Sequence, residues 1–462
     1  MEYILGTIAK QIPILKKNVD TLNYSEWPII MYQRSTVLIG DFILFYALLK
    51  LTKSLSISRV KFTLLLATMQ SFAGLVLVDN MHFQYNTVLF GIFFYGIALI
   101  ANEQFLMGAI VYSTCLCMKQ IYLYTAPGFV IFYLKFYIFR KGNSFSKFLT
   151  NTIKLGICIL SVLLIAFSPF ILLCIKNNSA EPIIQIMRRL FQFKRGLMHS
   201  YWAANFWAIY SFLDKVLFFL KGSNGMKKNK TAIGVTQETE FDVLPNITPM
   251  ISNGIVIATT LIYITKSLML TKPDVKNPLD HKKVQTNSLI KYCIISNLIF
   301  YNFGFQVHEK AFMIVSLLTL IYYFIEDNNE KYITSGKGEG DYLLTLSNLI
   351  VLVGGITQMP LIHNFKDYLP KISIFVTYYC FVTFFFFKKS RPNLLLVIFV
   401  IMCIALDFNT VFQNQFNYDL CDCKLLKLLQ KINQRFPFAS LMLFSVINSI
   451  MTQIIFVVLF LF

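Results

Sequence analysis

Long apolar runs, separated by short polar segments, recur along almost the whole chain. An α-helix needs about 20 consecutive apolar residues to cross the hydrocarbon core of a bilayer. The pattern predicts about thirteen membrane-spanning helices, at residues 34–50, 62–78, 87–101, 104–118, 121–139, 151–175, 249–270, 287–305, 310–325, 342–358, 371–387, 392–408 and 437–462. The predicted fold class is therefore an all-α polytopic membrane protein, with the lipid bilayer as a partner.

The basic residues between these runs predict how the chain is threaded. Short loops rich in Lys and Arg stay in the cytosol, and the richest are residues 50–61, 140–147, 272–283 and 388–391. The second and third of these loops can both be cytosolic only if the chain crosses an even number of times between them. The apolar stretch 201–220, which carries charged residues, is therefore predicted to form an amphipathic helix inside one long lumenal loop, residues 176–248.

The potential glycosylation sites agree with this layout. N-x-S/T sequons belong on the lumenal side, and all of them fall there, at Asn23, Asn177, Asn229 and Asn246. A basic cluster in the same predicted loop disagrees with it, and consists of Lys221, Lys227, Lys228 and Lys230. The topology thus remains an expectation.

Composition and charge narrow the class of protein. The chain holds 42 Lys and Arg against 23 Asp and Glu, a net charge of +19, yet only 14% of its residues are charged and 56% are hydrophobic. A soluble domain carries about 25% charged residues, and disordered chains are poor in aromatics, so both classes are excluded. The cations form no continuous stripe, which argues against nucleic acid. No set of His, Cys and carboxylates has metal-ligand spacing, so neither a metal nor a cofactor is expected.

The first polar cluster follows the predicted span 62–78 and reads Asp79-Asn80-Met81-His82-Phe83-Gln84-Tyr85-Asn86. An acid, an imidazole and amides beside aromatic rings make a surface that can hydrogen-bond hydroxyl or phosphate groups. The alternative is that the rings and polar caps only anchor the chain at the membrane interface.

The second cluster lies in the predicted lumenal loop, where Arg188-Arg189-Leu190-Phe191-Gln192-Phe193-Lys194-Arg195 is followed by Tyr201, Trp202 and Asn205. Lumenal cations are not explained by the rule that places positive charge in the cytosol. Arg can grip a phosphate through two hydrogen bonds at once, and aromatic faces suit sugar rings. The alternative is contact with anionic lipids.

The third cluster, Gln306-Val307-His308-Glu309-Lys310, joins two predicted spans. Ionisable residues at a span end are costly and indicate a functional site. Here the alternative is a simple ion pair between Glu309 and a neighbour. Lys119 also lies at a span end, but a single Lys there usually extends its amine to the interface.

The three clusters, in this order and spacing, carry a family resemblance. The chain resembles the endoplasmic-reticulum alpha-1,3-glucosyltransferases that use dolichyl-phosphate glucose. The resemblance lies in His82-Phe83-Gln84-Tyr85-Asn86, in the run from Arg189 to Gly196, and in Val307-His308-Glu309-Lys310. That family has two members, and the stretch from Lys194 to Lys215 is similar to the one that adds the second glucose. The likeness extends from about Glu2 to about residue 325.

The resemblance implies a GT-C type fold in the endoplasmic-reticulum membrane, with the active face in the lumen. The implied reaction of N-glycosylation moves glucose from dolichyl-phosphate glucose to the monoglucosylated, dolichyl-diphosphate-linked oligosaccharide, with inversion at the sugar carbon. Cations must then stabilise the departing phosphate. On this resemblance we expect the donor's phosphate and glucose to contact His308, Arg195, Lys310 and Arg189. We expect the glycan cavity to contain Asp79, His82, Gln84, Tyr85, Asn86, Tyr201, Trp202 and Asn205.

The beginning of the chain departs from the family pattern. Family members start with a further membrane helix and a first lumenal loop that carries the Asp taken to be the catalytic base. We therefore expect an N-terminally truncated sequence that lacks this base, in which residues 1–33 are a remnant of the loop and modules 34–175 and 249–462 flank the long lumenal loop. The sister enzyme that adds the first glucose, and a non-catalytic membrane partner or a lipid or sugar transporter, remain alternatives.

Overall fold

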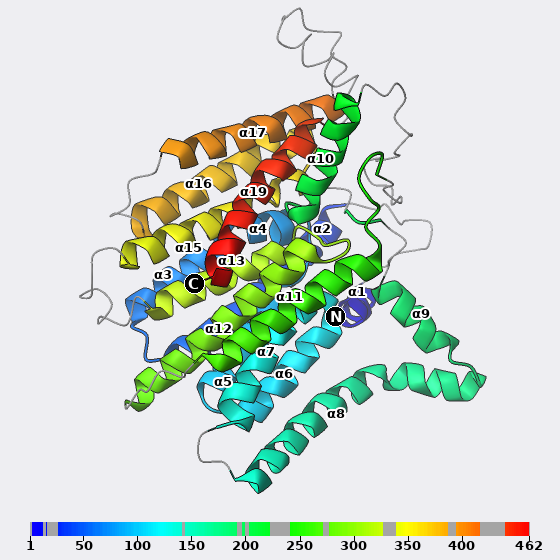
Figure 1. Cartoon of the computed structure of the whole chain (residues 1–462), viewed down its shortest axis with the longest axis vertical. Coiled ribbons are helices and arrows are strands. Elements are labelled where there is room, and N and C mark those ends of the chain that lie inside the picture. Colours follow the sequence, from blue (N-terminus) through cyan, green and yellow to red (C-terminus); the bar gives the residue numbers. More distant parts are fainter. Residues whose placement is uncertain are drawn as a thin grey trace, which may run out of the picture.

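The computed structural model describes residues 2–12, 15, 26–140, 144–191, 196–198, 203–221, 241–270, 277–326, 339–386, 394–415 and 439–461. None of these residues lies in a β-strand. Most of the helices run side by side at a shared tilt and form one bundle (Figure 1). The interior of the bundle is built from Phe, Leu, Ile and Tyr side chains that are almost completely buried. The chain is thus an all-α, polytopic membrane protein.

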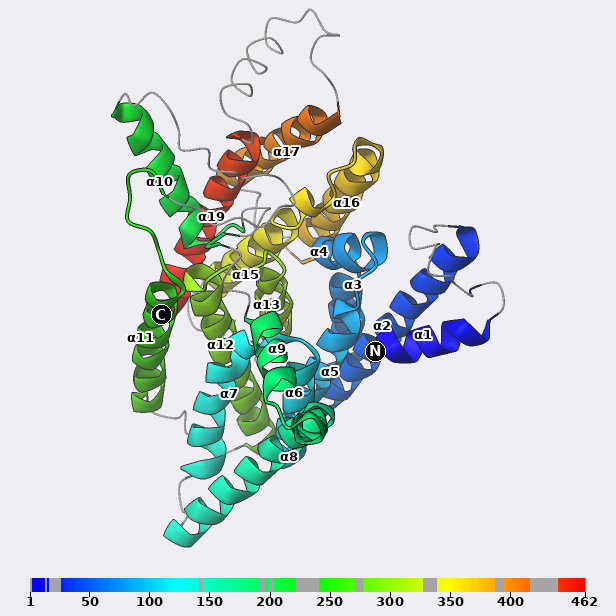
Figure 2. The same cartoon turned by 90° about the vertical axis from the view of Figure 1, so that its right-hand side faces the viewer.

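The N-terminal half of the bundle begins with a helix that lies across the start of the next one (Figure 2). Pro28 and Ser144 occupy positions that favour helix starts, at the first turn of α2 and as the N-cap of α8. In chain order the elements are α1 (Glu2–Gln11), α2 (Trp27–Ser54), α3 (Arg59–Gln70), α4 (Ala73–Leu75), η3 (Val76–Met81), α5 (Asn86–Ala101), α6 (Phe105–Met118), η4 (Gln120–Thr125), α7 (Ala126–Tyr133), η5 (Leu134–Ile138) and α8 (Phe145–Asn177).

The second half contains two helices of the long predicted loop and then the remaining apolar helices. The loop helices are α9 (Glu181–Leu190) and α10 (Phe206–Leu220). The others are α11 (Pro249–Met269), α12 (Pro278–Phe303), α13 (Ala311–Glu326), α15 (Glu339–Ile356), η7 (Met359–Leu361), η8 (Phe365–Asp367), α16 (Tyr368–Phe386), α17 (Leu394–Gln415) and α19 (Ala439–Leu461).

Each apolar run predicted to span the membrane coincides with a helix or with a series of adjoining helical segments. By length and composition, five described helices can cross a bilayer, or six if the bent pair Arg59–Gln70 and Ala73–Met81 is one span. Several shorter apolar helices accompany them. The helices are therefore confirmed, whereas the number of spans stays a prediction.

The stretch 201–220 was predicted to be a helix that does not cross the membrane, and the structure forms α10 there. Its charged residues bind a neighbouring loop. Asp214 is buried and accepts hydrogen bonds from the backbone N–H groups of residues 242–244, at 2.8 to 3.0 Å. Lys215 lies 2.8 Å from the carboxylate of Asp242. These contacts give both charges protein partners.

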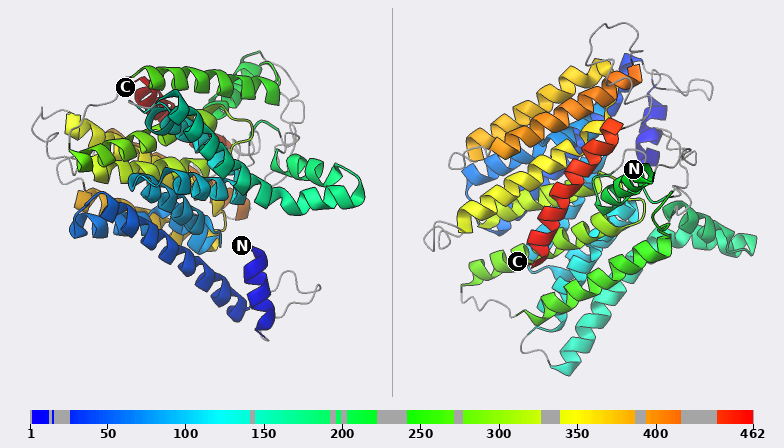
Figure 3. Two further views of the ribbon diagram at one scale, coloured as in Figure 1. Left: turned by 90° about the horizontal axis from the view of Figure 1, so that it is seen from below. Right: turned by 45° about the horizontal axis from the view of Figure 1, so that its top comes forward.

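Helix α8 is the least buried of the long helices. Its 33 residues are strongly apolar, yet no residue is buried in the 18-residue stretch that could cross a membrane. Together with α9 it projects from the side of the bundle (Figure 3). Such a surface suits lipid contact, because water would have to solvate it at high cost.

At Gly128, helix α7 packs closely against the backbone of α12. A Cβ atom at this position would come within 2.6 Å of the backbone nitrogen of Cys293 in α12. Small residues allow membrane helices to approach each other this closely.

We expect Gly128→Ala to lower the free energy of unfolding by about 1–3 kcal/mol, because backbone atoms cannot rotate away from the added methyl group. Gly156→Ala in α8 is the matched control, since a Cβ atom there would meet nothing within 4 Å. Thermal unfolding of the detergent-purified variants would test this, and equal midpoints for both variants would contradict it.

Candidate functional site

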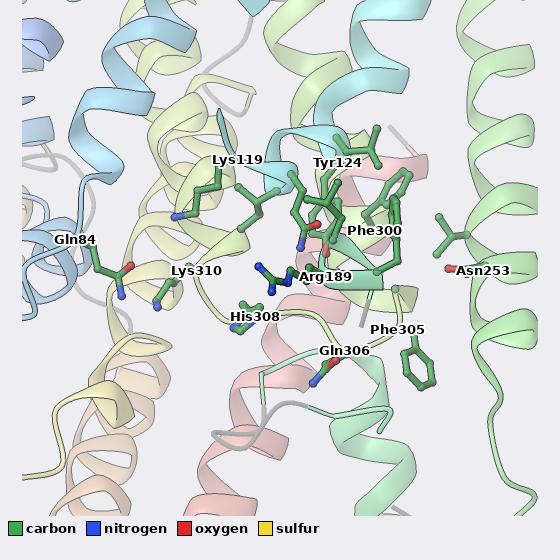
Figure 4. Close-up of a pocket in the computed structure, with 17 residues that line it drawn as sticks. Gln84, Lys119, Tyr124, Arg189, Asn253, Phe300, Phe305, Gln306, His308 and Lys310 are labelled. Carbon is green, nitrogen blue, oxygen red and sulfur yellow. The ribbon is translucent and has the colours of Figure 1, made fainter. Parts of the chain in front are cut away.

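A pocket of about 520 Å³ opens at the end of the bundle where α12 ends and α13 begins. Five separate segments of the chain supply its polar side chains (Figure 4). They are Gln84 before α5, Lys119 and Gln120 after α6, Arg189 in α9, Asn253 in α11, and the loop residues Gln306, His308 and Lys310. Residues of all three sequence clusters thus meet at one place, namely Gln84 of the first, Arg189 of the second, and Gln306, His308 and Lys310 of the third.

The pocket is cationic on one side and apolar on the other. The nitrogen-bearing ends of Lys119, Arg189, His308 and Lys310 point into the same space (Figure 4). None of the described lining residues is an Asp or a Glu. Tyr124, Phe300 and Phe305 lie on the other side of the pocket (Figure 4), and Phe191 also lines it. Such a pocket can hold an anionic group, which Arg and Lys bind through charge-assisted hydrogen bonds, next to a less polar moiety.

Lys119 is held in place by the first cluster. Its amine donates a hydrogen bond to Oδ1 of Asn86. The amide nitrogen of Asn86 donates in turn to Oδ1 of Asp79, at 2.6 Å. Burial, and then the nearby Lys310, lowers the pKa of Lys119 to about 8. Its positive charge is therefore sensitive to mildly alkaline pH.

Asp79 supports the pocket and does not line it. Its side chain is completely buried, and its Oδ2 accepts hydrogen bonds from the backbone N–H of Thr87 at 2.6 Å and from the Thr87 hydroxyl at 2.5 Å. A carboxylate with three hydrogen-bond donors makes a rigid anchor. We therefore assign Asp79 to the positioning of Asn86 and Lys119.

The other residues of the first cluster separate into different places. Gln84 lines the pocket. The Tyr85 hydroxyl accepts a hydrogen bond from Thr36 in α2, at 3.4 Å. His82 is exposed and does not line the pocket; partial desolvation and then the charge of Lys310 lower its pKa.

The loop that carries His308 and Lys310 is fixed at both ends of its first turn. The indole Nε1 of Trp207 donates to the carbonyl of Gly304 at 3.0 Å. The backbone N–H of Gln306 donates to the carbonyl of Leu197 at 2.9 Å. The chain on the other side of the loop turns directly into α13. His308 and Lys310 are thus held by the bundle and by the α9–α10 connection.

The predicted residues of the second cluster have different outcomes. Arg189 lies in the pocket wall, whereas its neighbour Arg188 forms an exposed ion pair with Glu181, at 3.4 Å. Asn205 does not line the pocket: it is buried, and its Oδ1 accepts the backbone N–H of Trp207 at 3.2 Å. The predicted residues Arg195, Tyr201 and Trp202 lie outside the described residues.

Sequence reasoning gave too little weight to several pocket residues. Lys119 was interpreted as an interfacial Lys, because nothing in the local sequence shows that Asn86 lies beside it. Gln306 belongs to the third cluster, but Asn253 occurs in an apolar helix without a distinctive pattern. Among the residues that the structure describes, no three His, Cys, Asp or Glu side chains come together as a metal site would require.

The sequence of this chain is similar to those of known proteins over most of its length. The profile of the ALG6, ALG8 glycosyltransferase family matches residues 1–459. The dolichyl pyrophosphate Glc1Man9GlcNAc2 alpha-1,3-glucosyltransferase of Candida albicans is 31% identical over 427 residues, which cover 85% of this chain and 66% of the relative. The proteins of the same name from Schizosaccharomyces pombe and Bos taurus are 34% and 32% identical, over 70% and 68% of this chain and 62% and 60% of their own lengths.

The chain therefore spans less than two thirds of the length of these relatives. The match to the family profile nevertheless extends over almost every residue. It includes the clusters that meet in the pocket and the last third of the chain, where resemblance was expected to fade. The chain belongs to the ALG6, ALG8 glycosyltransferase family.

Proposed function

We propose that this protein is a hexosyltransferase that moves glucose from dolichyl-phosphate glucose to the monoglucosylated lipid-linked oligosaccharide, in alpha-1,3 linkage. The observation that carries the proposal is the convergence of Lys119, Arg189, His308 and Lys310 in one pocket without a described acidic wall residue. The names of the relatives, which specify Glc1Man9GlcNAc2, support the second-glucose step over the first. The site of action would be the endoplasmic-reticulum membrane, with the pocket in the lumen.

The reaction requires a group that stabilises negative charge on the donor's phosphate. The bond between the glucose C1 and the phosphate oxygen breaks, its electron pair stays on dolichyl phosphate, and the acceptor oxygen forms a new bond at C1 from the opposite side. The leaving group thus gains a negative charge, which the pocket's cations are placed to stabilise. A base must accept the acceptor's proton, and we assign this role to none of the described residues.

The donor's lipid tail must remain in contact with apolar surface. Arg189 lies at the end of α9, which follows the lipid-facing helix α8, and Val256 of α11 lines the same pocket. Exposed apolar side chains continue along both long helices, including Ile257 and Leu261 of α11. We therefore place the isoprenoid chain along this side of the bundle, where it stays within the bilayer.

The size profile of lipid-linked oligosaccharides in cells depleted of this protein tests both the glucosyltransferase activity and its assignment to the second glucose. We expect the species with one glucose to accumulate and to disappear when expression is restored. Accumulation of an unglucosylated species would point to the sister enzyme. An unchanged profile would contradict glucosyl transfer.

Two adjacent arginines provide a test of the donor pocket. We expect Arg189→Ala to raise the KM for dolichyl-phosphate glucose by about 10- to 100-fold, because a charge-assisted hydrogen bond contributes roughly 1.5–3 kcal/mol. Arg188→Ala is the matched control, since this residue pairs with Glu181 on the exposed side of α9, and its KM should change less than twofold. Equal effects of both substitutions in vesicle assays would contradict the assignment.

The lowered pKa of Lys119 predicts an alkaline limit. The cation is present below a pH of about 8 and is lost as the pH rises through that value. We expect kcat/KM for the donor to fall in this range. Lys119→Arg should move the fall to higher pH, because a guanidinium stays protonated. Superimposable pH profiles of the two proteins would show that Lys119 does not hold the donor.

A further inference from the structure

The loop between α12 and α13 presents consecutive side chains to opposite environments. His308 and Lys310 line the pocket, whereas Glu309 between them is only 2% exposed and faces the interior. A rotation of the backbone at Glu309 would therefore turn the side chains of His308 and Lys310 away from the pocket. A contact that holds this peptide group in place therefore also holds these two side chains in the pocket wall.

One buried side chain contacts the backbone at this point. Gln358 follows α15 and is completely buried. Its amide nitrogen donates a hydrogen bond to the carbonyl oxygen of Glu309, at 3.0 Å. A second hydrogen bond of the same nitrogen, 3.1 Å long, reaches the hydroxyl of Thr357. The amide thus uses its donors to join the end of α15 to the start of α13.

The turn that carries Gln358 is itself held tightly. The buried amine of Lys371 donates to the carbonyl oxygens of Met359 at 3.2 Å and Ile362 at 3.0 Å. The same amine forms an ion pair of 2.5 Å with Asp407 of α17. A Cβ atom at Gly74 would lie 3.2 Å from Cγ of Gln358, so α4 packs against its side chain. The position of Gln358 is therefore restrained by its surroundings, independently of the 308–310 loop.

We propose that Gln358 is a positioning residue, whose side-chain amide holds the Glu309 carbonyl so that His308 and Lys310 face the donor pocket. The proposal rests on the proposed function for the identity of the ligand, an isoprenoid phosphate that carries a sugar. Gln358 does not line the pocket and reaches the ligand only through the 308–310 loop.

Chemistry restricts which side chains could replace it. Leu has no donor, so Gln358→Leu leaves the Glu309 carbonyl without this hydrogen bond in a buried position. Glu has similar length, but Gln358→Glu places a carboxylate oxygen against a carbonyl oxygen, which repel each other when the acid is ionised. Both changes release the loop, and the second should do so more strongly.

A matched control exists between the same two helices. Ser316 in α13 is buried, and its hydroxyl donates to the carbonyl of Ile350 in α15 at 3.2 Å. Ser316→Ala removes a buried hydrogen bond between these elements without touching the 308–310 loop. It reports how much a general loosening of this contact would change each measurement.

The experiment compares the intact chain with the Gln358→Leu, Gln358→Glu and Ser316→Ala variants in three measurements. We expect both Gln358 variants to raise the KM for dolichyl-phosphate glucose and the Kd for farnesyl phosphate by about tenfold. Ser316→Ala should leave both constants within about twofold, although all three variants lower the thermal midpoint. Equal midpoint losses with unchanged KM and Kd would overturn the proposal and leave only a structural role.

A further readout, the labelling rate of a cysteine, needs no substrate. Lys310→Cys places a thiol in the pocket wall, where a cationic methanethiosulfonate reagent can label it, with the labelled peptide identified by mass spectrometry. Adding Gln358→Leu should change the labelling rate at least about fivefold, whereas adding Ser316→Ala should not. An unchanged rate overturns the positioning role. If this rate changes but the intact chain binds no isoprenoid phosphate, the proposed function fails and the positioning role stands.

Discussion

The pocket depends on how the carbonyl groups at the end of α12 are satisfied. The last carbonyls of a helix have no partner within it, and here neighbouring helices provide donors. The Ser252 hydroxyl of α11 donates to the carbonyl of Phe303 at 2.6 Å, and the Trp207 indole of α10 donates to that of Gly304 at 3.0 Å. The amide of Gln453 in α19 reaches the side chain of Asn302 at 2.7 Å. Helices α10, α11 and α19 therefore define where the His308 loop leaves the bundle.

A second constraint is the gathering of like charges. Lys119, Lys310 and Arg189 repel one another when no anion is bound, and burial adds to the cost. The described structure places the compensating carboxylate, Asp79, behind Asn86, where it orients Lys119 through a neutral amide. Because the acid is not in the pocket wall, it does not compete with an incoming anion. The arrangement keeps the site open at the expense of stability, which is common where binding requires unpaired charge.

The sequence predicted the helices well, because a bilayer imposes a length and a composition that can be counted along the chain. It also named Gln84, Arg189, His308 and Lys310 as candidate site residues, and the structure brings these four side chains to one pocket. It could not distinguish pocket residues from their supports. Asp79 and Asn205 have the same chemistry as ligand-binding residues, and only the fold shows that both are buried. Lys119 was underestimated and Gln358 was not singled out, because the partners of both side chains are more than thirty residues away in sequence.

Because helices α8 and α9 carry Arg189, the thickness of the bilayer can affect where this side chain lies in the pocket. Helix α9 has no buried residue, and its main packing partner is α8. Helix α8, in turn, buries only Leu155 among its 33 residues, and its apolar surface suits lipid contact. A membrane that is thinner or thicker than this helix makes it tilt or shift at a cost of only fractions of a kcal/mol per Å. Since Arg189 is carried at the end of this arm, such a tilt alters the distance between its guanidinium and the cations of the rigid bundle. Lipid composition can thereby tune the site mechanically.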